Sequence, residues 1–187
     1  MTHHRRRNNG IDPSKINETV ELSPAQRYAA FKQTQAKQRT VAAEFARSMP
    51  FELDEFQMQA NDALEAGDNV LVAAPTGAGK TVAADFAIYL AQTRNVKAFY
   101  TTPIKALSNQ KYHDLVDQYG TDKVGLLTGD TSINSEADIV VMTTEVLRNM
   151  LYEHSVTLEA LRYVILDEVH YLADRFRGPV WEEVIIH

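Results

Sequence analysis

Two stretches of the sequence carry side chains that suit a phosphorylated ligand. The first is a loop that begins at Ala74, has glycines at 77 and 79, and ends in a lysine and a threonine. Glycines let backbone N–H groups turn inward around phosphate oxygens, and a helix starting after the loop adds partial positive charge. The lysine ammonium suits the outer phosphates, and the threonine hydroxyl suits Mg²⁺. We expect the cofactor to contact Pro75, Thr76, Gly77, Ala78, Gly79, Lys80 and Thr81.

The second stretch is the acidic pair Asp167-Glu168, which follows the apolar run 163–166. Asp167 suits the binding of Mg²⁺ through water, and Glu168 suits the orientation or deprotonation of an attacking water. Two surface acids after a strand are the alternative reading. We disfavour this alternative because Lys80, Thr81 and Asp167 are expected at the same edge of the sheet, which two unrelated surface acids would not explain. Lys80, Asp167 and Glu168 are the expected catalytic residues, with Thr81 and Asp167 as the metal ligands.

Apolar runs and helical spacing alternate along the chain, which predicts an α/β fold. We expect strands over 69–73, 96–101, 124–127, 139–142 and 163–166, with helices between them. This alternation favours a parallel sheet sandwiched by helices. Polar residues follow the strands at their carboxyl ends, where such sheets bind ligands.

The N-terminal part differs in composition from the rest. Residues 1–50 hold nine Lys/Arg and four Asp/Glu, whereas residues 51–187 hold ten and 21. We expect a disordered tail over 1–23, a helical extension over 24–50 that ends at Met49-Pro50, and a core domain over 51–187. The chain has no cysteine, which excludes disulfides and cysteine-bound zinc. Because it also lacks an apolar run of about 18 residues, we expect a cytoplasmic protein without a membrane partner.

The segment just before the loop offers groups that could recognise a base. Gln57 lies on an expected helix capped by Asp54, and its amide can pair with one donor and one acceptor of adenine. Phe51 could stack on the same base. A glutamine on a helix is usually a surface residue, so this expectation depends on the motifs around it.

The residues of these motifs resemble those of the Ski-like DExH-box RNA helicases of superfamily 2, including actinobacterial members. The resemblance covers residues 51–187 and rests on the glycine loop, the box at 167–170, and the runs 102–111, 128–130, 142–148 and 174–183. It implies a RecA-like fold that binds ATP and Mg²⁺ and moves along single-stranded RNA. It also implies that His170 couples the two ligands, and that RNA contacts Pro103, Lys105, Gly129, Thr143 and Thr144.

The resemblance further implies parts that this sequence does not contain. We expect residues 51–187 to be most of the first RecA-like domain, truncated after the DExH box and with an incomplete sheet. A second RecA-like domain of the same protein is the expected missing partner. One alternative is an ATP- and nucleic-acid-binding module without turnover of its own. Another is a DNA-directed helicase, since backbone contacts distinguish RNA only through the 2′-OH. A small-molecule kinase is disfavoured, because it would need neither the DExH box nor the motifs at the strand ends.

Overall fold

The computed structural model describes residues 23, 25, 26, 28, 32 and 39–186. It divides the chain into two units, residues 1–40 and 41–187, and the second unit carries every element discussed below. Apart from Ser23, the expected disordered tail lies outside the described residues. No described helix is long and apolar enough to cross a membrane. The domain boundaries expected from the sequence stay predictions.

A five-stranded sheet forms the centre of the second unit, in the order β3-β2-β4-β1-β5. Its strands are β1 (Lys97–Thr102), β2 (Val124–Thr128), β3 (Thr131–Ile133), β4 (Ile139–Thr143) and β5 (Leu161–Leu166). All neighbouring strands run parallel except β3, which pairs antiparallel with β2. The fold class expected from the sequence is therefore confirmed, with the short strand β3 as an addition.

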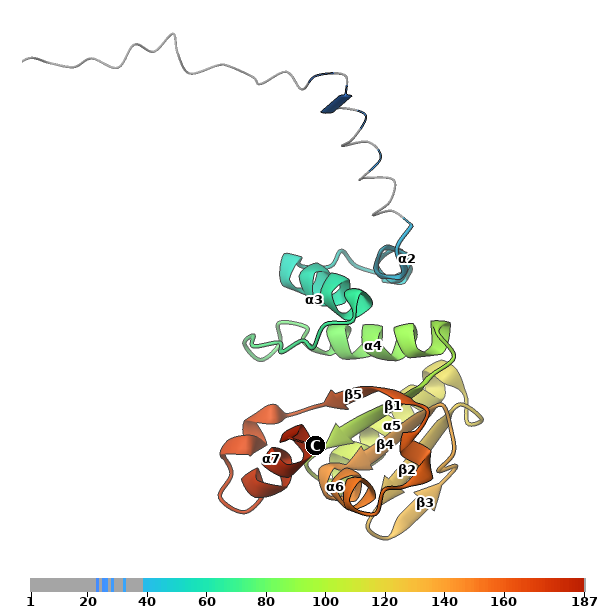
Figure 1. Ribbon diagram of the computed structural model, residues 1–187, viewed down its shortest axis with the longest axis vertical. Helices are drawn as coiled ribbons and strands as arrows, with labels where there is room; N and C mark the ends of the chain where they lie inside the picture. The colour runs from blue at the N-terminus through green and yellow to red at the C-terminus, as the bar shows by residue number, and fades with distance from the viewer. Residues whose placement is uncertain (1–22, 24, 27, 29–31, 33–38, 187) are drawn as a thin grey trace, which may run out of the picture. The chain divides into compact units, whose positions relative to one another are not determined.

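Helices cover both faces of this sheet (Figure 1). On one face, α4 (Thr81–Thr93) and α5 (Lys105–Tyr119) pack on Tyr100, Leu126 and Val141. On the other face, α6 (Thr144–Tyr152) and α7 (Gly178–Ile186) pack around Phe99 and Met142. Short 3₁₀ turns precede and follow β5, at Val156–Leu158 and Val169–Ala173. Successive residues of a strand point to opposite faces, so one buried strand supplies side chains to both cores.

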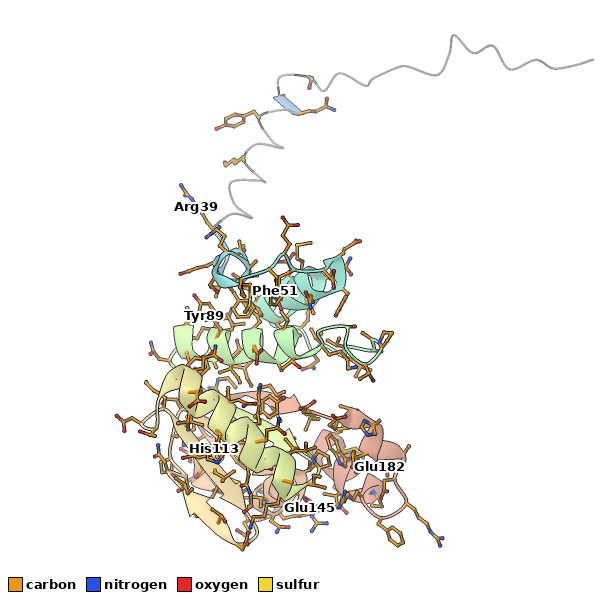
Figure 2. The ribbon with its side chains drawn as sticks, turned by 180° about the vertical axis from the view of Figure 1, so that it is seen from behind. Arg39, Phe51, Tyr89, His113, Glu145 and Glu182 are labelled. Carbon is orange, nitrogen blue, oxygen red and sulfur yellow. The ribbon has the colours of Figure 1, made fainter. Side chains whose placement is uncertain are left out.

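A second helical layer, α2 (Val41–Ser48) and α3 (Glu55–Ala66), covers the outer side of α4. Phe45 of α2 is buried against the rings of Phe86 and Tyr89, with ring centroids 5.2 and 5.4 Å away. Figure 2 shows Tyr89 on α4 and Phe51 beside the α2–α3 layer. A core aromatic of this size stabilises a fold by about 3–5 kcal/mol relative to alanine. The layer thus fixes α4, whose first turn follows the glycine loop.

The expected extension is not one continuous helix, because Arg39 and Thr40 form a turn before α2. The carboxylate of Glu65 accepts the backbone N–H groups of Val41 and Ala42, at 3.0 and 2.7 Å. The first N–H groups of a helix have no partner within it, and a carboxylate there also complements the helix dipole. This contact from α3 explains why a new helix begins at Val41.

The strand expected over 69–73 is absent, which corrects the sequence-based prediction. Residues 68–75 have no regular secondary structure, and the side chain of Leu71 is 78% exposed. An apolar run favours burial, but a strand also requires a neighbour that pairs with its backbone. Within the described residues no strand pairs with this segment, and β5 is hydrogen-bonded only to β1.

Candidate nucleotide-binding site

The glycine loop leads directly into α4, as expected from the sequence. Gly77 and Gly79 have φ angles of 83° and 76°, in the left-handed region that favours glycine. Lys80 immediately precedes α4, and Thr81 is its first residue. The Lys80 ammonium donates to the carbonyl oxygens of Ala74 and Pro75, at 2.8 and 3.1 Å. Lys80 and Thr81 are exposed at the helix N-terminus, where backbone N–H groups attract anions.

Gln57 connects α3 to this loop. Its side chain is 4% exposed, its Oε1 accepts from the Asp54 backbone N–H at 2.8 Å, and its Nε2 donates to the Gly79 carbonyl at 3.0 Å. The amide therefore supports the loop and the start of α3, which the sequence did not indicate. Phe51 is 51% exposed and available for stacking. Recognition of adenine by Phe51 and Gln57 stays a prediction.

The acidic pair lies directly after β5. The Asp167 backbone N–H donates to the Thr101 carbonyl at 3.0 Å, which extends the β1–β5 pairing by one residue. Its Oδ1 accepts from the Glu168 N–H at 2.8 Å, and its Oδ2 accepts from the Tyr100 hydroxyl at 2.7 Å. The carboxylate is thus held by two donors, one on each oxygen.

Thr81, Asp167 and Glu168 line one pocket of about 200 Å³. Tyr100, Gln110, Lys111 and Asp114 contribute to the same pocket. Hard cations such as Mg²⁺ prefer oxygen ligands and are often held by one or two carboxylates together with substrate phosphates. The hydroxyl of Thr81 and the oriented carboxylate of Asp167 fit such an ion, beside a loop suited to phosphates.

Glu168 adopts an uncommon backbone conformation, with φ at 57°. Left-handed backbone at a non-glycine residue costs about 1–3 kcal/mol and clusters at functional sites. Its Oε2 lies 3.0 Å from Nδ1 of His170, a contact that becomes an ion pair when the imidazole is protonated. His170 also lies against the ring of Tyr171. The structure therefore brings Glu168 and His170 together, while the coupling role of His170 stays a prediction.

Tyr100 is a pocket residue that the sequence reasoning missed. It is 2% exposed, and its pKa is raised far above the usual range by burial first and by the charge of Asp167 second. The Lys111 ammonium lies 4.9 Å from the ring centroid and 3.1 Å from the Asp85 carboxylate. The available signal was a phenol in the middle of a strand that is buried from residue 98 to residue 102, since a buried hydroxyl needs a partner.

The residues expected to contact nucleic acid gather at the carboxyl ends of three parallel strands. Pro103 follows β1, Gly129 follows β2, and Thr143 ends β4. Lys105 starts α5 and is exposed, whereas Thr144 is 1% exposed and donates to the Thr102 carbonyl at 3.2 Å. The hydroxyl of Thr144 therefore joins the ends of β1 and β4. Contacts between these residues and nucleic acid stay predictions.

Lys105 has a close acidic partner at this edge. Its ammonium lies 2.5 Å from the carboxylate of Asp130, which also accepts from the Thr128 hydroxyl at 3.0 Å. The hydrogen bond from Lys105 is the main reason that the pKa of Asp130 lies below its usual range. Both side chains are largely exposed, so the pair contributes little to stability. A phosphate bound by Lys105 would have to replace this carboxylate.

The helix-covered parallel sheet, the glycine loop before α4 and the acidic pair after β5 together define a RecA-like nucleotide-binding domain. The DEAD/DEAH box helicase family matches residues 54–187, and the chain belongs to this family. The described fold is therefore that of a superfamily 2 helicase ATP-binding domain.

Two individual proteins show which kinds of helicase this chain is similar to in sequence. The chain is 61% identical over 145 residues to a protein from Mycobacterium leprae described as probable helicase HelY, covering 78% of this chain and 16% of that protein. It is 54% identical over 141 residues to the antiviral helicase SKI2 of Saccharomyces cerevisiae, covering 75% and 11%. The resemblance to Ski-like helicases is thereby confirmed. The chain spans less than a fifth of the length of either relative.

A solved structure supports the same assignment. The helicase Lhr of Mycobacterium smegmatis, bound to single-stranded DNA and AMP-PNP, superimposes with a TM-score of 0.59 at 30% identity. The matched region covers 75% of this chain and 21% of that one.

Proposed function

We propose that this chain is the ATP- and Mg²⁺-binding front portion of an ATP-dependent RNA helicase that acts in the cytoplasm. The observation that carries the proposal is the convergence of Thr81, Asp167 and Glu168 on one pocket beside the glycine loop. Thr81 lies more than eighty residues before Asp167 and Glu168 in the sequence, and the fold brings the threonine and the acidic pair to one pocket. Such convergence is typical of a working site rather than of a structural turn.

Each residue has a distinct role in this proposal. Backbone N–H groups of the loop and the Lys80 ammonium bind the phosphates, while Thr81 and Asp167 hold Mg²⁺. A bound Mg²⁺ would supply positive charge that offsets the charge of the phosphates. Glu168 orients the attacking water, and its contact with His170 offers a path from the ATP pocket to nucleic acid.

Single-stranded RNA is the proposed track, and it would cross the carboxyl ends of β1, β2 and β4. Lys105 offers a phosphate contact, and the exposed backbone at Gly129 allows close approach of a sugar–phosphate chain. The resemblance to Ski-like RNA helicases supports RNA. A DNA track is the second candidate, because the Lhr structure holds single-stranded DNA.

Turnover by the 187-residue chain alone is expected to stay near background. Among the described residues that line the pocket, none is an arginine. In nucleotide hydrolases an arginine directed at the transferred phosphate raises the rate by about 10³–10⁵. We propose that a second RecA-like domain supplies this charge and closes over the ATP. The chain itself would then act as a binding module.

Phosphate release measured with and without poly-uridine or poly-deoxythymidine tests this proposal. The chain should release phosphate at the rate of its Glu168→Gln variant, with either polymer. The full-length protein should show turnover that poly-uridine stimulates and that Glu168→Gln abolishes. Stimulation of the full-length protein by poly-deoxythymidine alone would favour the DNA alternative. Equal rates of ATP hydrolysis by the full-length protein and its Glu168→Gln variant would contradict the proposal.

A further inference from the structure

We propose that Tyr100 is a positioning residue for Asp167, holding the carboxylate in the orientation that metal–nucleotide binding requires. This inference rests on the proposed ATP and Mg²⁺ site and adds a residue to it. The sequence motifs identify Asp167 but give no reason for the tyrosine in β1. The structure supplies that reason through one short contact, at 2.7 Å between the Tyr100 hydroxyl and Asp167 Oδ2.

The pairing of β1 with β5 brings these two residues together. Tyr100 lies opposite Ile165, and the Asp167 N–H continues the ladder by bonding to the Thr101 carbonyl. The Tyr100 side chain points to the face covered by α4 and α5, where its ring belongs to the buried cluster with Ile88 and Leu115. Because the ring is packed on all sides, the hydroxyl is a rigid donor rather than a mobile one.

A neutral donor suits this place better than a charged one. The carboxylate has about four lone-pair positions, and the hydroxyl and the Glu168 N–H occupy one on each oxygen. Rotation of the carboxylate is thereby restricted while positions on both oxygens remain open. A lysine or arginine at position 100 would restrain the same oxygen but would offset the negative charge that a cation needs.

The nearby cation, Lys111, has an acidic partner of its own. Lys111 reaches over the Tyr100 ring, 4.9 Å from its centroid, and its ammonium pairs with Asp85 of α4 at 3.1 Å. Both side chains of this pair are largely buried. Asp85 thus offsets the Lys111 charge, and the lysine stem supports the ring from the α5 side. The Tyr100 ring that holds the carboxylate is therefore itself contacted from both helices of this face.

The test is the Mg²⁺ dependence of nucleotide binding in Tyr100→Phe, which removes the hydroxyl and keeps the ring. Binding of a fluorescent ATP analogue to the 187-residue chain is measured at increasing Mg²⁺ and, separately, in EDTA. We expect the Mg²⁺ concentration for half-saturation to rise by about 10-fold, as for other residues that orient metal ligands. Binding in EDTA should not change, because the glycine loop is untouched. A merely structural tyrosine would shift both measurements or neither, and either result overturns the inference.

Tyr119→Phe is the matched control. Tyr119 packs against the same cluster, but the neighbour of its hydroxyl is Gln118, at 3.4 Å, rather than Asp167. This variant should keep the wild-type Mg²⁺ dependence. An equal shift in both variants would show that loss of any core hydroxyl has this effect, and would overturn the inference.

A double-mutant cycle with Asp167→Asn tests whether the hydroxyl acts through the carboxylate. In the Asp167→Asn background, Tyr100→Phe should produce no further change in Mg²⁺ dependence. Additive effects would overturn the inference.

If Tyr100→Phe does not fold, 3-fluorotyrosine can be placed at position 100, where it keeps the hydroxyl. Its ¹⁹F resonance should then shift when Mg²⁺ is added to the nucleotide-bound chain, and an unmoved resonance overturns the inference.

Different results would contradict the proposed ATP site and the proposed role of Tyr100. Wild-type chain that binds no nucleotide, or binds it equally well after Lys80→Ala, would contradict the ATP site itself. Lys80-dependent binding together with unchanged Mg²⁺ dependence in Tyr100→Phe would contradict only the role of Tyr100.

Discussion

The side-chain amide of Gln57 donates a hydrogen bond to the carbonyl oxygen of Gly79 over 3.0 Å, joining helix α3 to the phosphate-binding loop. The same amide accepts from the Asp54 N–H at the start of α3. A residue expected to read adenine therefore also supports the loop that would hold the phosphates. An adenine edge bound by Gln57 would compete with these two partners, which links base recognition to loop conformation.

Gln57→Ala is expected to weaken ATP binding by about 10-fold and to reduce the preference for ATP over GTP. The loss combines the amide–base contact with an unsatisfied Gly79 carbonyl, at roughly 0.5–1.5 kcal/mol for each hydrogen bond. Competition binding of ATP and GTP measures both effects. Gln59→Ala is the control, since Gln59 is an exposed residue of α3 whose side chain donates to Glu55. Equal behaviour of the two variants would show that Gln57 is an ordinary helix residue.

Gly79→Ala should destabilise the loop more than Gly77→Ala. Both glycines have positive φ, which costs an alanine about 1–2 kcal/mol. At Gly79 an added Cβ would also lie 2.6 Å from Nε2 of Gln57, whereas nothing lies within 4 Å at Gly77. Thermal unfolding of the two variants without nucleotide gives the comparison. A larger loss of stability in Gly77→Ala would contradict the supporting role of the contact between Gln57 and the loop.

The Lys105–Asp130 pair should limit nucleic-acid binding. Asp130→Asn frees the lysine and removes a negative charge from the proposed RNA path, so affinity for poly-uridine should rise by about 2- to 5-fold at low salt. Lys105→Met should lower the affinity and make it less dependent on salt. Fluorescence anisotropy across a salt series measures both changes. Weaker binding in Asp130→Asn would show that the carboxylate supports the track instead of competing for Lys105.

The same pair makes a prediction about pH. Because Lys105 lowers the pKa of Asp130 in the folded protein, the pair stabilises the fold above the usual aspartate pKa. That contribution is lost as the pH falls through the lowered value. NMR titration of Asp130 in Lys105→Met should show the pKa returning towards its usual range. An unchanged pKa would mean that the hydrogen bonds from Thr128 and from the backbone account for the shift without Lys105.

Glu65→Ala should destabilise the domain by about 1–2 kcal/mol, because α2 loses the carboxylate that satisfies its first N–H groups. Chemical denaturation measures the loss. Asp62→Ala, at an exposed position of the same helix, is the control and should be nearly neutral. If both variants behave alike, the start of α2 does not depend on α3.

Several features of the fold and site could be predicted because they depend on local sequence. Apolar runs located β1, β2, β4 and β5. The glycines at 77 and 79 located the loop because their conformation is unfavourable for other residues.

Features that depend on distant partners could not be predicted. The run at 69–73 has strand composition but no pairing neighbour among the described residues. The break before α2 depends on Glu65, which lies more than twenty residues away. The contacts of Gln57 with Gly79 and of Tyr100 with Asp167 likewise follow from tertiary packing, which residue types alone do not specify.

Calorimetric titration of Mg-ATP into the 187-residue chain and its Lys80→Ala variant tests the central claim most directly. The account predicts saturable binding by the wild-type chain and roughly 10- to 100-fold weaker binding by the variant, the loss of one charge-assisted contact with phosphate. Lys123→Ala, which removes a surface lysine paired with Asp138 outside the pocket, should bind like wild type. Wild-type chain without detectable binding, or equal affinities for wild type and Lys80→Ala, would contradict the assignment of this site.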